Sequence, residues 1–140
     1  MTKRELLLDY VKHFIGEPYH YGGDNPMDDF DCSGLVSEVC RALNIIGRQE
    51  RLTAQGLFDV FNSRNWQGPV APSNILFFGK SVLAVSHVAI CSEVDGFMYE
   101  AGGGTSTTTT IESAAATDAF VRLRPIRADL VGTMDVVRTD

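Results

Sequence analysis

The chain has 140 residues, of which 44% are hydrophobic and 21% charged, a composition typical of one compact globular domain with a buried core. Its formal net charge is −6, and since nucleic-acid-binding proteins usually carry a basic face, nucleic acid is a poor candidate partner. The same acidity argues against electrostatic attachment to an anionic membrane or wall surface. We therefore expect a single domain over residues 1–140.

The cysteines and the first residues bear on location. Cys32, Cys40 and Cys91 are an odd set without the spacing of a disulfide framework, which indicates a reducing compartment. The segment MTKRELLLDYVKHF interrupts its apolar residues with charges, unlike a signal peptide. No stretch approaches the roughly 20 apolar residues of a membrane span. These features predict a protein synthesised in the cytoplasm, which something else must carry if it acts elsewhere.

The first half of the chain predicts three helices. Apolar residues recur at helical spacing over residues 4–15, from about Cys32 to Asn44, and over residues 53–64, where Thr53 is a candidate cap. Between the first two helices, the segment EPYHYGGDNPMDDFD is rich in Gly, Pro, Asp and Asn, and predicts a loop.

The second half predicts strands. Five short runs, several of them alternating and separated by turn residues, are SNILFFG, SHVAIC, GFMYEA, AFVRLRPI and VGTMDVVR. Asp95-Gly96, between the second and third runs, is a strong signal for a tight hairpin. The tract GGGTSTTTT predicts a loop between strands. Helices followed by an antiparallel sheet make an α+β fold.

The segment FDCSGLVSEVC places Cys32 at the start of a predicted helix. A cysteine attacks carbonyls only as thiolate, and the unpaired N–H groups and positive dipole end of a first helical turn favour an anion. Asp31 is a plausible cap, and Ser33 and Gly34 are small enough to admit a substrate. Cys40, on the apolar helix face, and Cys91, at a strand end, are more simply explained by packing.

A nucleophilic cysteine needs a base, and the chain has three histidines. His13 and His20 lie in a polar helix face and a loop, where histidines are usually solvated. Strand alternation places His87 on one face with Ala89 and Cys91, and a histidine facing a cysteine-bearing helix is the geometry of a Cys–His couple. His87 alone also suits a core histidine, so both roles stay open at this point.

Several motifs in order resemble the NlpC/P60 cysteine peptidases. They are PYHYGG, DCSGLVSEV, ILFFG, SHVAI and a strand that ends in a polar residue before Ala-Gly, and they cover about residues 16–101. The resemblance implies a papain-like α+β fold, in agreement with the predicted helices and sheet. It looks like the short, single-domain form found among bacteriophage and prophage proteins.

The resemblance also implies catalytic roles. Cys32 would be the nucleophile and His87 the general base, while Tyr19 would offer its hydroxyl to the oxyanion beside the Cys32 backbone N–H. The residue that orients the imidazole falls on Glu100, where the family usually has histidine. A carboxylate can accept the imidazole N–H and stabilise the imidazolium.

The position of Glu100 raises a geometric question. A strict two-residue Asp95-Gly96 turn would place Cys91 opposite Glu100, and His87 about 13 Å further along the strand at roughly 3.3 Å per residue. Contact between His87 and Glu100 then requires a wider loop or a bulge.

The implied function is hydrolysis of the bond between γ-D-glutamate and a diamino acid in peptidoglycan stem peptides, through an acyl-enzyme. The expected substrate is a stem peptide or muropeptide, phage tail or lysis proteins are candidate partners, and action at the cell wall would require delivery by one of them. Two other functions stay open: a catalytically inactive binding or structural module of a phage tail, and a thiol amidase acting on a small γ-glutamyl compound.

We expect neither a cofactor nor a metal. The segment DNPMDD has a proline and lacks the central glycine of a calcium loop. Cys32, His87 and Glu100 could in principle bind zinc, but the chain has no pair of closely spaced ligands. The run Gly102-Gly103-Gly104 is not a phosphate-binding loop, because neither a lysine nor a helix start comes after it.

Overall fold

Three of the helices correspond to the predicted ones. The structure is a computed structural model that describes residues 1–20, 23–25, 29–48, 50, 52–103, 109–117 and 119–138. The three helices are α1 (Lys3–Lys12), α2 (Cys32–Ala42) and α3 (Ala54–Ser63). Thr53 caps α3 as predicted by accepting a hydrogen bond from the Gly56 N–H. The first helix begins earlier than predicted, because Thr2 and Glu5 form a capping box, and it ends before residue 15.

The segment predicted to be only a loop contains regular structure. Its residues form two short antiparallel strands, β1 (Asp24–Asn25) and β2 (Asp29–Phe30), with Asp24 paired to Phe30. That part of the prediction was wrong, because ladder hydrogen bonds join backbone groups and tolerate polar side chains. Tyr21 and Gly22 of the PYHYGG motif and residues 26–28 lie outside the described residues.

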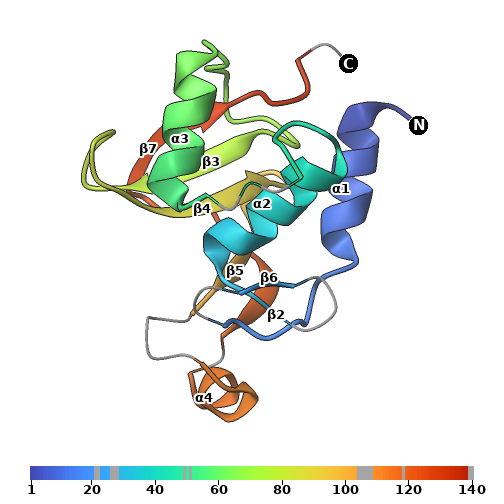
Figure 1. Ribbon diagram of the computed structural model, residues 1–140, viewed down its shortest axis with the longest axis vertical. Coiled ribbons are helices and arrows are strands. Elements are labelled where there is room, and N and C mark those ends of the chain that lie inside the picture. Colours follow the sequence, from blue (N-terminus) through green and yellow to red (C-terminus); the bar gives the residue numbers. More distant parts are fainter. Residues whose placement is uncertain are drawn as a thin grey trace.

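The five predicted strands form one antiparallel sheet, which confirms the α+β fold. They are β3 (Ile75–Gly79), β4 (Val85–Cys91), β5 (Phe97–Gly102), β6 (Phe120–Pro125) and β7 (Leu130–Met134). Their order in the sheet is β6-β5-β4-β3-β7. In Figure 1 α2 crosses the middle of the molecule in front of the sheet, with α1 and α3 on either side of it.

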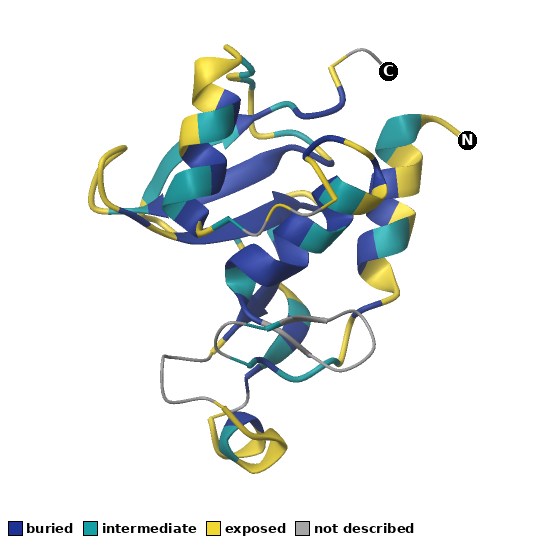
Figure 2. Ribbon diagram, viewed as in Figure 1, coloured by how far each residue is buried: buried dark blue, intermediate teal, exposed yellow. Residues whose placement is uncertain are grey.

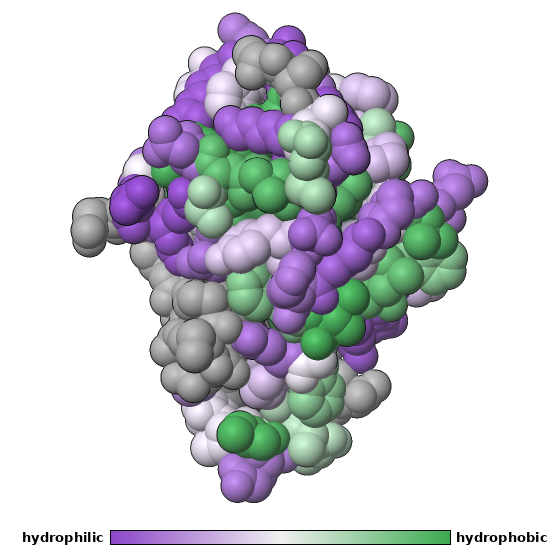
Figure 3. Space-filling view, turned by 90° about the vertical axis from the view of Figure 1, so that its right-hand side faces the viewer, coloured by the Kyte–Doolittle hydropathy of each residue, from purple (hydrophilic) through white to green (hydrophobic). Residues whose placement is uncertain are grey.

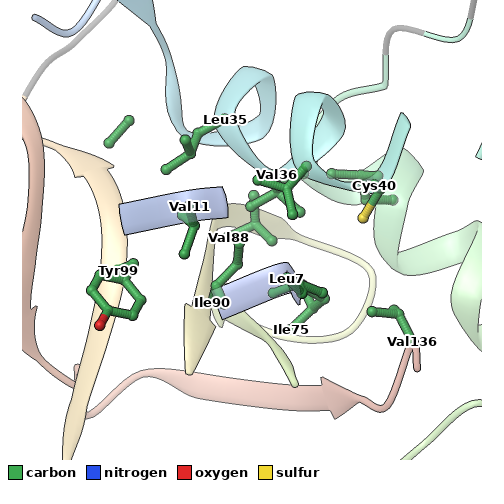
Figure 4. Close-up of a cluster of buried hydrophobic side chains, with 14 of the residues drawn as sticks. Leu7, Val11, Leu35, Val36, Cys40, Ile75, Val88, Ile90, Tyr99 and Val136 are labelled. Carbon is green, nitrogen blue, oxygen red and sulfur yellow. The ribbon is translucent and has the colours of Figure 1, made fainter. Parts of the chain in front are cut away.

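The core lies between this sheet face and the helices, and it positions α2. Alternate residues of the central strands, such as Ile75, Val88 and Ile90, pack against Leu35 and Cys40 of α2 (Figure 4). Burying a large aliphatic side chain contributes about 1.5–3 kcal/mol. The deepest burial in Figure 2 follows α2 and the central strands, so the helix that begins at Cys32 is held along most of its length.

The opposite sheet face has a smaller apolar cluster. It consists of Leu76, Phe78, Ala89, Cys91 and Met98, with Ile126 and Leu130 packed against them. Ala89 and Cys91 share this face, as strand alternation predicted.

A fourth helix, α4 (Ile111–Ala116), was not predicted. Thr110 caps it and forms a capping box with Ser113. It lies apart from the sheet and is largely exposed (Figures 1 and 2). The tract GGGTSTTTT comes just before it, and residues 104–108 of that tract lie outside the described part of the chain.

The outer surface gives no sign of membrane insertion by a helix. Within the described residues, every helix is too short or too polar to cross a bilayer. Seen from the α1 side, the surface mixes hydrophilic and hydrophobic side chains (Figure 3).

Candidate active site

Cys32 is the first residue of α2, and the helix start is capped as predicted. Asp31 accepts a hydrogen bond of 2.7 Å from the Gly34 N–H and one of 3.4 Å from the Ser33 hydroxyl. The Cys32 side chain is half-buried and lines a cavity. The free N–H groups and dipole of the first turn therefore face the space in which a substrate carbonyl would lie.

Gly34, the second small residue after Cys32, accommodates backbone and does not provide the predicted access for a substrate. A Cβ on Gly34 would collide with the backbone carbonyl of Gly23, and the same carbonyl accepts a 2.9 Å hydrogen bond from the Asp31 N–H. Ser33 is buried. Gly34 therefore admits the preceding loop and not a substrate, so the expectation of substrate access was wrong for Gly34, whereas Ser33 lines part of the cavity beside Cys32.

His87 and Glu100 form a buried pair. Nε2 of His87 lies 2.5 Å from Oε2 of Glu100, and the two residues are 9% and 3% exposed. Burial alone would lower the pKa of His87, but hydrogen bonds with Cys32 and Glu100, and their negative charges, raise it to about 9. With Nε2 directed at Glu100, Nδ1 is the ring nitrogen left to face Cys32.

The register of β4 and β5 explains how His87 and Glu100 meet. Ile90 pairs with Tyr99 and Cys91 with Met98, so the strands are joined by the wider loop that contact between His87 and Glu100 requires, and not by a strict two-residue turn. Continuing this register places Glu100 opposite Ala89, two residues after His87 on β4. Glu100 is therefore a diagonal neighbour of His87, within reach of a long side chain.

The end of this ladder is also where α2 begins. Over the fully described strands β4 and β5, the paired residues end at Ile90 and Tyr99. His87 and Glu100 lie beyond that end and line the cavity together with Cys32. The apolar side of α2 packs on the sheet face opposite to that of His87. Its first residue, Cys32, nevertheless lies near His87, because β4 and β5 are no longer paired at this point.

Glu100 is held as a carboxylate by its surroundings. Its Oε1 lies 4.0 Å from Nε of Arg122 and 3.7 Å from Nε of Arg124. Burial would raise the pKa of Glu100, but the hydrogen bond and charge of His87 and the two arginines lower it. The carboxylate lies over Gly102, where an added Cβ would be 2.6 Å from Oε1, so a larger residue there would displace the carboxylate.

The cavity has two halves that meet at Cys32. The first half, of about 460 Å³, contains His87, Glu100, Arg124 and Arg127. The second half, of about 510 Å³, contains no arginine among the described residues; its lining includes Asp31, Ser33, Leu52, Thr53 and Gln55. Tyr19, Cys32 and Ser86 line both halves.

The predicted catalytic residues are thus brought together. Cys32, His87, Glu100 and Tyr19 all line the first half of the cavity. Tyr19 is 8% exposed, and its backbone N–H donates to the carbonyl of Ala119 over 2.9 Å. The arrangement can bind a carbonyl compound beside a thiol, a histidine and a carboxylate.

The other cysteines and histidines lie elsewhere. Cys40 is fully buried in the core (Figure 4), and burial raises its pKa to about 12. Cys91 is 5% exposed, and burial together with the charge of Asp95 raises its pKa. His13 is exposed. Among the described residues, no group of three His, Cys, Asp or Glu side chains is arranged to bind a metal ion.

Residues that sequence analysis did not single out complete the site. Ser86, Arg124 and Arg127 line the first half of the cavity. A signal for the arginines was present, since FVRLRPIR alternates basic residues along a predicted strand of an acidic chain. Alternation predicts that Arg122 and Arg124 share one face of β6. It does not predict that they lie next to Glu100, because that depends on the pairing of β5 with β6.

Known proteins share the sequence pattern and the fold of this chain. A profile of the NlpC/P60 family matches residues 16–124. The γ-DL-glutamyl hydrolase of Bacillus subtilis (strain 168) is 42% identical over 38 residues, which are 27% of this chain and 9% of the hydrolase.

Two solved structures from Mycobacterium tuberculosis share the fold. The peptidoglycan hydrolase RipB is 19% identical with a TM-score of 0.67, over 96% of this chain and 65% of its own. RipD, described as a non-catalytic NlpC/p60 domain protein adapted to peptidoglycan binding, is 16% identical with a TM-score of 0.64, over 97% of this chain and 98% of its own. Identities this low establish the fold alone.

Proposed function

Because the chain belongs to the NlpC/P60 family, we propose that it is a cysteine peptidase that hydrolyses the γ-D-glutamyl–diamino acid bond of peptidoglycan stem peptides. One observation carries this proposal. Cys32, at the first turn of a helix, lines one cavity with His87 and Glu100, and the imidazole of His87 is hydrogen-bonded to the carboxylate of Glu100.

In the first step, the Cys32 thiolate attacks the γ-carbonyl carbon of the substrate. The carbonyl oxygen becomes an oxyanion, which the Cys32 N–H at the start of α2 and the Tyr19 hydroxyl stabilise. The raised pKa of His87, about 9, keeps the imidazole protonated near neutral pH, so the imidazolium can remain paired with the thiolate before attack.

In the second step, the tetrahedral intermediate collapses. His87 donates its proton to the nitrogen of the diamino acid, the C–N bond breaks, and the γ-glutamyl group stays on Cys32 as a thioester. A water molecule then attacks the thioester after giving a proton to the neutral His87, and the Cys32–acyl bond breaks. Glu100 accepts the other ring N–H throughout and stabilises the imidazolium.

The substrate assignment draws on the relatives. One structural relative is named a peptidoglycan hydrolase and the curated relative a γ-DL-glutamyl hydrolase, which agrees with an amide of the glutamate γ-carboxyl as the scissile bond. Since this chain spans 65% of the first and 9% of the second, the bond remains our proposal. Action at the cell wall, after delivery by a phage tail or at lysis, is part of the same proposal.

A second candidate is a module that binds muropeptide without cleaving it. RipD, whose described role is peptidoglycan binding without catalysis, has the same fold. The two candidates make different predictions for the thiol, since a binding module does not need Cys32 to be reactive.

Hydrolysis of a stem tetrapeptide, followed by mass spectrometry, separates the candidates. The enzyme should release a fragment that begins with the diamino acid, and Cys32→Ala should abolish the release. Cys91→Ala is the matched control, because it removes a thiol on the far sheet face and should leave turnover intact. Binding of muropeptide without cleavage by either the unmodified protein or the control would favour the module.

A further inference from the structure

The wall of the cavity next to His87 carries positive charge. Arg124 and Arg127 line it, and Arg122 lies 4.0 Å from Glu100. The chain as a whole has a net charge of −6, so three arginines within six residues of β6 and the segment that follows are a local exception. A positive wall in an acidic protein favours an anionic group on the substrate.

The nearby acidic groups do not fully neutralise the positive charge of these arginines. Glu100 shares one carboxylate among His87, Arg122 and Arg124. Arg127 is paired with Asp129 through two hydrogen bonds of 3.0 and 2.8 Å. The Nε of Arg124, in contrast, is 3.7 Å from Glu100, which is beyond hydrogen-bond length, and its side chain is 48% exposed. Arg124 is therefore the arginine best placed to meet a ligand.

The chemistry indicates which part of the substrate lies there. His87 must protonate the departing nitrogen, so the residue that leaves has to lie beside His87. Only the first half of the cavity includes His87 in its described lining, while the second half shares Tyr19, Cys32 and Ser86. The leaving residue thus occupies the half that contains Arg124.

We propose that Arg124 binds a carboxylate of the leaving amino acid, so that the preferred substrates are γ-glutamyl peptides whose released residue has a free carboxylate. This inference rests on the proposed function for the identity of the leaving residue. The planar guanidinium offers two parallel N–H donors to a carboxylate, whereas a neutral carboxamide of the same shape gains no ion pair. The carboxylate takes no part in bond breaking and acts through binding alone.

The test uses two matched tripeptides, L-Ala-γ-D-Glu-L-Lys with the single carboxylate of the lysine free or converted to a primary carboxamide. The unmodified enzyme should show a kcat/KM at least ~10-fold higher for the free acid. Arg124→Ala should bring the ratio close to one by slowing the free acid alone, and Arg124→Lys should keep part of the preference. Arg48→Ala, an exposed arginine outside this cavity, should leave the ratio unchanged.

Two results would overturn the inference. A ratio near one in the unmodified enzyme would show that the carboxylate is not recognised. Equal slowing of both peptides by Arg124→Ala would show that the arginine acts only through Glu100. Affinities of both tripeptides for Cys32→Ala, with and without Arg124→Ala, repeat the comparison without catalysis. If the unmodified protein cleaves neither peptide, the proposed function fails, and the ratio of dissociation constants still decides the role of Arg124.

Discussion

Cys32 and Cys40 lie on the same helix, eight residues apart, and their surroundings are opposite. Cys32 is half-buried, lines a cavity and interacts with His87. Cys40 is fully buried among apolar side chains, where burial raises its pKa to about 12. The first turn of a helix offers free N–H groups and an exit to solvent, whereas the third turn offers only packing. The place of a thiol in the helix, and not its residue type, decides which chemistry is open to it.

The largest expected effect comes from removing the base. His87→Ala should lower kcat/KM on the stem tetrapeptide by about 10³-fold or more, since general acid–base catalysis typically contributes 10²–10⁴-fold. Cys32 would then be as inert as Cys40, although it keeps its place on the helix. Steady-state kinetics measures the loss, and activity close to that of the unmodified enzyme would contradict the assigned role.

The next effect comes from the partner of the base. Glu100→Gln should lower kcat/KM by roughly 10–100-fold, because the neutral amide stabilises the imidazolium less well. In the unmodified enzyme the activity should fall on the alkaline side near pH 9, as His87 loses its proton. Without the negative charge the pKa of His87 decreases, so this limb should move to lower pH. A pH profile of kcat/KM that does not move would show that Glu100 does not act through His87.

A smaller loss should follow from crowding Glu100. In Gly102→Ala, the new Cβ would be 2.6 Å from Oε1 of Glu100, and the flexible carboxylate would have to move away. We expect about a tenfold decrease in kcat and little change in the melting temperature, since the clash is with a side-chain end. Unchanged kcat would mean that the enzyme tolerates displacement of the carboxylate.

For the buried cysteine, Cys40, we expect an effect on stability and none on catalysis. Cys40→Ala should leave kcat/KM unchanged and lower the free energy of unfolding by about 1–2 kcal/mol, because it leaves a small cavity in the core. Cys32→Ala should have little effect on the free energy of unfolding. Urea denaturation of both variants checks this, and a core-sized loss in Cys32→Ala would contradict the distinction between the two cysteines.

Much of this arrangement could be predicted from local sequence. The cap at Asp31, the helix start at Cys32 and the strand that contains His87 depend on neighbours within a few residues. The register that brings Glu100 to His87 could not be predicted, because Asp95-Gly96 indicates a turn without fixing its length. The reason for Gly34 was also missed, since the carbonyl that it accommodates belongs to a loop residue eleven positions earlier.

The residues around Glu100 show the same limit. Gly102 lies two residues after Glu100 on the same strand and is next to the carboxylate, whereas Arg124 approaches it only through the pairing of β5 with β6. Short-range patterns predict which elements form, whereas contacts between strands depend on a register that short-range patterns do not contain.

Site-resolved alkylation with iodoacetamide tests the central claim most directly, namely that Cys32 is activated by His87 and Cys40 is not. The alkylated fraction of each cysteine is followed by mass spectrometry between pH 6 and 8, with glutathione as the reference thiol. We predict that Cys32 reacts at least ~100-fold faster than Cys40 and Cys91, and faster than glutathione, because it lines the cavity beside His87 whereas the other two thiols are buried. A Cys32 rate no higher than that of glutathione, or equally slow labelling of all three cysteines, would contradict it.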